Sequence, residues 1–266
     1  MSAAAFGWTL LATGCSLALL LAATFAIGVR EGKHSVMDVA WGAGITVAGV
    51  ASFLASAGHG VTERRWLLVA TAVIWGYRLA LHVAVRARGA GEDPRYTELL
   101  ARAPGNRNAY ALRAVYLPQA LILMVACLPL AAGMVQRAPT GAITVTGAVV
   151  WLVGFAFETL GDWQLTRFRS DPANRGQIMD RGLWRYTRHP NYFGDACMWW
   201  GLFCISYGSA VQLATVVSPL LMTFILTRGT GQRLTDRRMA RSRPGYAEYA
   251  ARTSGFIPAP PRRRPQ

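Results

Sequence analysis

The residues best suited to chemistry gather in one segment of the second half of the chain, 158–201. Glu158 and Asp162 are four residues apart, which places them on one face of a helix. Arg169 lies two turns beyond Asp162 if that helix continues. A denser group follows within eleven residues: Arg185, Tyr186, Arg188, His189, Asn191, Tyr192 and Asp195.

These residue types suit an anionic cofactor that also carries hydroxyl and aromatic groups. Arginine binds phosphate through paired donors, asparagine and aspartate bind amides or ribose hydroxyls, and tyrosine offers a flat face to a base or nicotinamide. Pro190 keeps His189 out of the helical region, so a helix with free amide groups should begin near Asn191. The charged segment 228–258 adds Asp236 and Arg238. A helix cap together with the usual excess of basic residues on the cytoplasmic side would explain the arginines. It would not explain the asparagine, tyrosines, histidine and aspartate among them, so we expect a cofactor site.

A second candidate site lies in the first half of the chain. Asp38 falls near the start of one apolar run, and Tyr77 and Arg78 fall within the next. A charge inside a membrane costs a few kcal/mol unless it is paired or lines a polar cavity. Asp38 and Arg78 therefore either neutralise each other or border a substrate cavity, with Trp41 and Tyr77 close by. The loop that follows carries Gly91-Glu92-Asp93-Pro94-Arg95-Tyr96, which we interpret as an element that orders the loop.

Membrane helices must position these residues. Apolar residues make up 53% of the 266 residues, and they fall into runs of about the ~20 residues that cross a bilayer as helix. The runs are 6–29, 36–58, 66–86, 111–134, 143–161, 192–209 and 210–227. We predict an all-α, polytopic bundle of about seven spans that forms one transmembrane domain, 1–258. The break at 207–209 is weak, so the last two runs could be a hairpin or one bent helix.

The distribution of charge predicts the topology. The net charge is +15, and with the N-terminus outside, nearly all basic residues lie in connections on the cytoplasmic side, as does the C-terminus. This asymmetry argues against nucleic-acid binding and predicts an active site on the cytoplasmic side of a bacterial-type inner membrane. We expect 1–134 to form the substrate half, 135–258 the cofactor half, and 259–266 a disordered basic tail near lipid headgroups. The four cysteines lack ligand spacing, so no metal site is expected.

Five segments together resemble the DUF1295 family, which belongs with the steroid 5-alpha-reductase-like membrane enzymes. They are DVAWG at 38–42, WGYRL at 75–79, GEDPRY at 91–96, GLWRYTRHPNYFGD at 182–195 followed by WWG, and RPGYAEYAARTSGFIP at 243–258. The resemblance implies a seven-span enzyme that uses NADPH to reduce a double bond conjugated to a carbonyl in a lipid-like substrate.

The resemblance also implies roles for individual residues. Glu158, Asp162 and Arg169 match the family's cofactor site at the end of the fifth span, with Arg169 on the phosphate side. Asn191 and Asp195 match an asparagine followed four residues later by an acid. Asp38 and Tyr77 are the nearest equivalents of the catalytic acid and tyrosine, which would hydrogen-bond the developing enolate oxygen.

Two other classes of function remain open. The Arg-His-Pro-x-Tyr motif also resembles the isoprenylcysteine carboxyl and phospholipid methyltransferases, which bind S-adenosylmethionine. Those enzymes carry a Glu-Glu pair where this chain has a single acid, Asp236, and S-adenosylmethionine has no phosphate for the arginines. A transporter or a non-enzymatic lipid binder is the third class, although the chain shows no inverted repeat.

Overall fold

The computed structural model describes residues 2–229 and 231–262, and it is all-α across them. The only β pairing among these residues is an isolated bridge between Thr187 and Ser254. Six helical runs in the described residues are long and apolar enough to cross a membrane, which confirms the prediction of a polytopic membrane bundle.

The helical runs follow the predicted apolar segments closely. The six spans are α1 (Ala3–Glu31), α2 (Val36–Ala55), α3 (Thr62–Ala87), the run Arg107–Met134, α8 (Ala142–Ser170) and the run Gln212–Ser242. The run Arg107–Met134 contains α5 (Arg107–Ala111), η1 (Leu112–Tyr116), α6 (Leu117–Ala126) and α7 (Leu128–Met134). The last run contains most of η4 (Ala210–Val216), then α10 (Val217–Thr227) and α11 (Gln232–Ser242). Outside the spans lie α4 (Pro94–Leu100), η2 (Pro172–Asn174), η3 (Gly182–Arg185) and α12 (Tyr246–Arg252).

The sixth predicted span, 192–209, is a shorter helix. It is α9 (Pro190–Ser206), whose 17 residues reach about 26 Å. It ends at Ser206, and η4 begins at Ala210, so the break at 207–209 separates two helices.

The chain divides into two compact units. Unit 1 comprises Met1–Val145 and Leu202–Ser218, and unit 2 comprises Thr146–Gly201 and Pro219–Gln266. Unit 1 includes all of the predicted substrate half, whereas the candidate cofactor residues all lie in unit 2. Unit 1 extends to Val145, beyond the predicted substrate half, and it also takes in residues 202–218.

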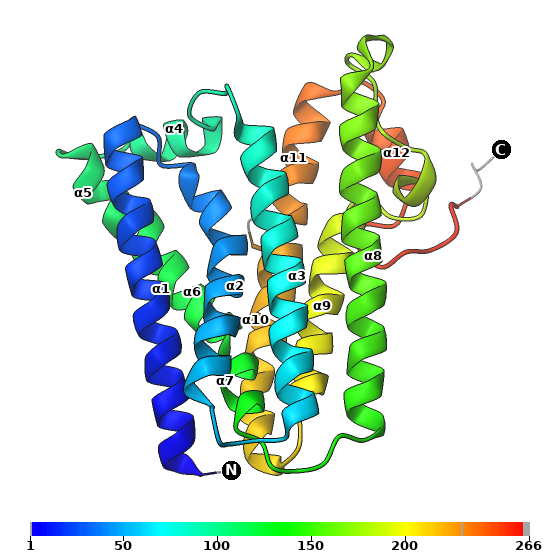
Figure 1. Ribbon diagram of the computed structural model, residues 1–266. Helices are drawn as coiled ribbons and strands as arrows, with labels where there is room; N and C mark the ends of the chain where they lie inside the picture. Colours follow the sequence, from blue (N-terminus) through cyan, green and yellow to red (C-terminus); the bar gives the residue numbers. More distant parts are fainter. Residues whose placement is uncertain (1, 230, 263–266) are drawn as a thin grey trace. The chain divides into compact units, whose positions relative to one another are not determined.

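In unit 1, α1, α2 and α3 run side by side (Figure 1). Glycine permits the closest approach: a Cβ on Gly42 would lie 2.4 Å from the amide nitrogen of Ala80 and from the carbonyl oxygen of Gly76. Arg64 is buried, and its guanidinium donates to the carbonyl oxygens of Ile205 at 3.0 Å and Ala138 at 2.6 Å. Since a buried charge needs such partners, Arg64 fixes the end of α9 to the rest of the unit.

The loop between α3 and α5 is ordered by Glu92. Its carboxylate accepts hydrogen bonds from the backbone amides of His34 at 2.7 Å and Ser35 at 2.9 Å, where α2 begins. Burial would raise the pKa of Glu92, but the hydrogen bonds from Ser35 and His34 lower it. The interpretation of this loop as an ordered element is confirmed.

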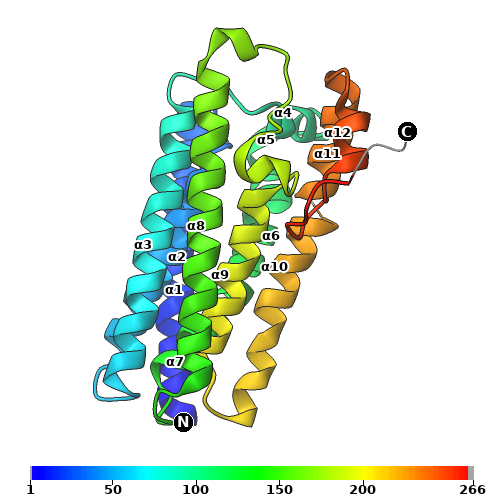
Figure 2. The ribbon, with the colours of Figure 1, turned by 90° about the vertical axis from the view of Figure 1, so that its right-hand side faces the viewer.

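In unit 2, α8 and α9 run side by side (Figure 2). A Cβ on Gly194 would lie 2.5 Å from the amide nitrogen of Glu158 and from the carbonyl oxygen of Gly154, so glycine is required where the two backbones meet. This close approach brings the start of α9 next to the polar end of α8.

The segment after α12 is partly ordered, in contrast to the expected disordered tail. The Ala259 amide donates to the Tyr186 carbonyl at 3.0 Å, and the Arg262 amide donates to the Arg252 carbonyl at 2.9 Å. These bonds hold 259–262 along unit 2. The rest of the predicted tail, 263–266, lies outside the described residues.

The role of Glu92 can be tested by pH. A carboxylate whose pKa is lowered by folding stabilises the fold above its unfolded pKa, about 4.3, and loses that contribution as pH falls through the folded pKa. Glu92→Gln should lower the unfolding free energy by about 1–2 kcal/mol at pH 7. The difference from the unsubstituted protein should shrink below about pH 4. Thermal denaturation in detergent across pH measures this, and a difference that does not change with pH would contradict it.

Candidate functional site

Asp236 of α11 is the centre of a charged network in unit 2. One of its oxygens, Oδ2, accepts from Arg188 Nη2 at 2.8 Å, and Oδ1 lies 2.8 Å from His189 Nε2. The Tyr246 hydroxyl also donates to Oδ1. One carboxylate therefore joins the start of α9, the helix α11 and the start of α12.

Arg188 is held by more than this carboxylate. Its Nη1 donates to the carbonyl oxygens of Ala250 at 3.0 Å and Thr253 at 2.8 Å. Burial alone would lower the pKa of Arg188, but the hydrogen bond and negative charge of Asp236 raise it. The guanidinium is therefore committed to internal partners. The sequence placed Arg188, His189 and Asp236 at the cofactor, and the structure brings these three together with one another.

A second group forms where α8 meets α9. Glu158 and Asp162 are buried, with 4% and 8% of their surfaces exposed. Asn191 Nδ2 donates to Asp162 Oδ1 at 3.1 Å, and Asn191 Oδ1 accepts from the Tyr192 amide at 3.1 Å. The structure brings Asp162 and Asn191 together, because the glycine contacts allow the two helices to approach, and Glu158 lies beside Gly194 of α9.

Tyr192 continues this group toward α11. Its ring stacks on that of His189 with centroids 5.2 Å apart and planes at 2°. Its hydroxyl lies 3.4 Å from Thr235 Oγ1. The stacked pair fixes the plane of Tyr192 next to Asn191 on α9, and Asn191 in turn contacts Asp162 of α8.

The remaining candidates of unit 2 differ in their exposure. Arg169 is exposed near the end of α8, which continues to Ser170 as the spacing required. Arg185 and Tyr186 are exposed after η3, while Asp195 and Arg238 are half-buried.

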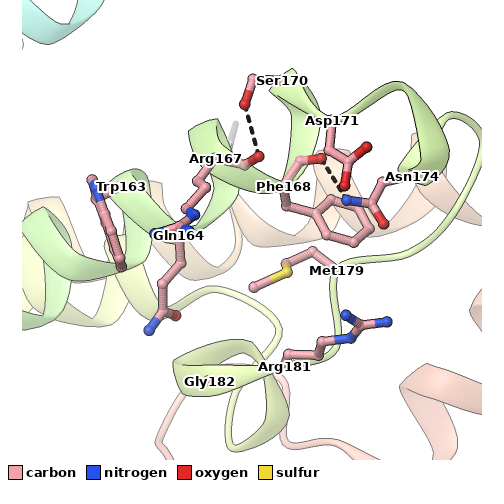
Figure 3. A pocket seen from close by; sticks show the side chains of 10 residues that line it. All are labelled: Trp163, Gln164, Arg167, Phe168, Ser170, Asp171, Asn174, Met179, Arg181 and Gly182. Atoms are coloured by element: carbon pink, nitrogen blue, oxygen red, sulfur yellow. Dashed lines mark hydrogen bonds between the residues drawn. The ribbon is translucent and has the colours of Figure 1, made fainter.

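A pocket of about 460 Å³ opens at the end of α8 (Figure 3). Its apolar lining comes from Trp163, Phe168 and Met179, and its polar lining includes Arg167 and Arg181. None of the sequence-predicted residues lines this pocket. The spacing of Trp163 and Arg167, four apart on a helix, was the available signal, and the guanidinium carbon of Arg167 lies 5.6 Å from the Trp163 ring centroid.

In unit 1, Asp38 has a tyrosine partner that the sequence did not indicate. Asp38 Oδ1 accepts from the Tyr96 hydroxyl at 2.7 Å, and Oδ2 accepts from Arg95 Nη2 at 2.6 Å. Arg95 is thus a basic partner of Asp38 that the sequence did not indicate. Tyr77 is 66% exposed on α3, whereas Tyr96 is 7% exposed.

The surroundings of Tyr96 are apolar with a few polar groups. It belongs to a buried cluster with Met37, Leu100 and Tyr116. Burial and the charge of Asp38 raise the pKa of Tyr96. The hydroxyl therefore stays protonated and remains a hydrogen-bond donor. The sequence shows Tyr96 within the GEDPRY segment. It does not show that Tyr96 contacts Asp38, which lies 58 positions earlier.

Removal of the central carboxylate of unit 2 should be costly. Asp236→Asn leaves the Arg188 charge without its counter-ion, and breaking a largely buried pair costs about 3 kcal/mol or more. Asp180→Asn is the matched control, because the Asp180–Arg252 pair is 37–39% exposed and such pairs contribute less than about 1 kcal/mol. Thermal denaturation of both variants measures the effect. Equal losses would show that Asp236 is no more than a surface charge.

Comparison with known proteins identifies one family. The family model described as "Protein of unknown function (DUF1295)" matches residues 24–253. No curated protein and no solved structure gives a significant match. The matched range contains both the Asp38 group and the Asp236 network.

Proposed function

Because the chain belongs to the DUF1295 family, whose model spans both polar groups, we propose that it is an NADPH-dependent membrane reductase. Its substrate is a lipid-like molecule, such as a steroid, with a carbon–carbon double bond conjugated to a carbonyl. Support comes from the residues described above and from the resemblance of the family to steroid 5-alpha-reductase-like enzymes. In this proposal the active site lies on the cytoplasmic side of a bacterial-type inner membrane.

One observation carries the proposal furthest: two buried carboxylates lie on α8 where it meets α9, and one of them, Asp162, accepts a hydrogen bond from Asn191. Glu158 and Asp162 lie at the polar end of a membrane span, where burial of a charge is expensive and is associated with function. With Asn191 they offer acceptors and a donor within a small volume. This set fits ribose hydroxyls and a carboxamide, and Arg169 is the candidate for the phosphates.

The Asp236 network gives these groups a fixed position. It ties the residues before α9 to α11 and α12 through Arg188 and His189. Since Asn191 follows directly, its side chain is oriented from both sides, by the network and by Asp162. In this proposal Arg188, His189 and Asp236 are positioning residues, and Asp162 and Asn191 contact the cofactor.

In unit 1 the Tyr96 hydroxyl is the proposed donor to the substrate carbonyl. NADPH, when bound, supplies a hydride to the β carbon of the enone. As negative charge develops on the carbonyl oxygen, Tyr96 stabilises it by a hydrogen bond. In the free protein the single hydroxyl proton of Tyr96 is donated to Asp38, so in this proposal it turns to the carbonyl oxygen when substrate binds, while Arg95 compensates the charge of Asp38. The apolar surroundings exclude water and strengthen this contact. Tyr96 thus replaces Tyr77 in the proposed catalytic pair.

A second candidate function, methyl transfer, is favoured by the pairing of Arg188 with Asp236. Its charge is neutralised by Asp236, so it is not free for a phosphate, and two buried carboxylates also suit S-adenosylmethionine, which is cationic at sulfur and carries a ribose. The alternative is therefore a membrane methyltransferase of the isoprenylcysteine carboxyl or phospholipid type.

Calorimetry separates the two functions. The detergent-purified protein should bind NADPH, and Asp162→Asn should weaken that binding about tenfold, because it removes a charged hydrogen-bond partner. Asp180→Asn, an exposed acid outside the α8–α9 contact, should leave the affinity unchanged within about twofold. Binding of S-adenosylmethionine with no response to NADPH would overturn the reductase proposal.

The catalytic pair has a matched test in two tyrosines. Tyr96→Phe should lower kcat/KM on the order of 100-fold, since it removes the donor to the carbonyl oxygen. Tyr77→Phe should have little effect, because Tyr77 is exposed. The measurement is NADPH oxidation with a panel of apolar enones. Loss of activity in Tyr77→Phe with activity retained in Tyr96→Phe would reverse the assignment.

A further inference from the structure

A second pocket of unit 2 has a lining dominated by arginine. It has a volume of about 490 Å³, and four arginines, Arg181, Arg185, Arg252 and Arg262, line it together with Asp180. The lining comes from three stretches of the chain, 180–185, 252–253 and 261–262. Arg181, seen in Figure 3, also borders the pocket at the end of α8.

The arginines are brought together by ordered backbone. The Arg262 amide donates to the Arg252 carbonyl, and the Ala259 amide donates to the Tyr186 carbonyl, next to Arg185. Tyr249 Oη donates to the Trp184 carbonyl at 2.6 Å. The three stretches are therefore fixed side by side. The positive-inside rule requires only that arginines lie on the cytoplasmic side of the membrane. It does not require that they surround one pocket, as these do.

Among the described residues, most of this positive charge has no compensating carboxylate. Asp180 pairs with Arg252 at 2.6 Å. Within the described part of the chain, Arg181, Arg185 and Arg262 have no carboxylate partner. Three like charges around one pocket repel each other, so an anion with several oxygen atoms is the chemistry that suits them. A phosphate group has that form, and the Asp180 carboxylate, already paired, leaves an excess of positive charge.

The position of the pocket along α8, relative to the membrane, indicates which molecule carries the phosphate. Trp163 is 54% exposed at the point where the apolar part of α8 gives way to charged residues, a position typical of the membrane interface. The Leu183 amide donates to Gln164 Oε1 at 3.0 Å, so Gly182 of the pocket lies beside the residue that follows Trp163. The pocket is thus at the level of lipid headgroups.

From these observations we infer that the arginine pocket binds the phosphate of an anionic phospholipid headgroup. The headgroup phosphate occupies the space between Arg181, Arg185 and Arg262, and its acyl chains extend along the apolar surface of the span below Trp163. This site is separate from the α8–α9 contact, so the inference does not depend on the proposed reductase activity. It also gives Arg185 a role other than the one expected from the sequence.

The test is lipid binding to the full chain in detergent, read by native mass spectrometry, with dioleoylphosphatidylglycerol and dioleoylphosphatidylcholine as probes. The unsubstituted protein should retain phosphatidylglycerol preferentially. The triple variant Arg181→Gln/Arg185→Gln/Arg262→Gln should lose affinity on the order of 100-fold, at about fivefold for each arginine. The variant should fold, because the three residues are exposed.

The control carries the same change in charge elsewhere on the protein. Arg102→Gln/Arg175→Gln/Arg241→Gln substitutes three exposed arginines that do not line the pocket. It should weaken phosphatidylglycerol binding less than about threefold. Equal losses in the two triple variants would overturn the inference, because general attraction to a basic protein would then explain the preference.

Two further probes distinguish the source of the phosphate. Displacement by millimolar inorganic phosphate, with no preference between the two lipids, would mean that the pocket takes a free anion. Weaker NADPH binding in the pocket variant alone, with lipid preference unchanged, would assign the arginines to the nucleotide. Either result would overturn the lipid assignment, whereas absence of NADPH binding by every variant would count against the reductase proposal and leave the lipid result standing.

Discussion

The compensation of buried charge is the constraint on which the polar part of this protein depends. The chain places charged residues at the ends of apolar helices, where each charge needs a partner because lipid and packed side chains cannot solvate it. Asp236 meets this requirement for Arg188, and Arg95 meets it for Asp38. Since each partner comes from a distant segment, neutralisation of charge also fixes the tertiary contacts that position the neighbouring polar groups.

The helices and their order could be predicted from the sequence, because span length and apolar composition are local properties. The α8–α9 group was also predictable: Glu158 and Asp162 share a helix face, and Pro190 marks the start of α9 near Asn191. The resemblance to the DUF1295 family, later confirmed by the match over 24–253, gave the same residues. In each case one short stretch of sequence carries enough information.

Contacts between distant segments could not be predicted in the same way. The pairing of Asp38 with Tyr96 depends on how the loop after α3 folds back onto α2, and this is set by Glu92 at the amides of His34 and Ser35. A single sequence does not show that pairing. Tyr77 was the nearer choice along the chain, but its side chain points away from the core. The ion pair of Arg188 with Asp236 could not be predicted for the same reason. Composition does not reveal which arginines are neutralised by a carboxylate elsewhere in the chain.

The interleaving of the two units has a consequence for biogenesis. Ribosomes synthesise the chain from its N-terminus, yet unit 1 needs residues 202–218, which emerge only after most of α8 and α9. Arg64 must wait for the carbonyl of Ile205, 141 residues later, before its buried guanidinium has all its acceptors. The guanidinium of Arg64 therefore reaches its full set of acceptors only after the segment 202–218 has been synthesised.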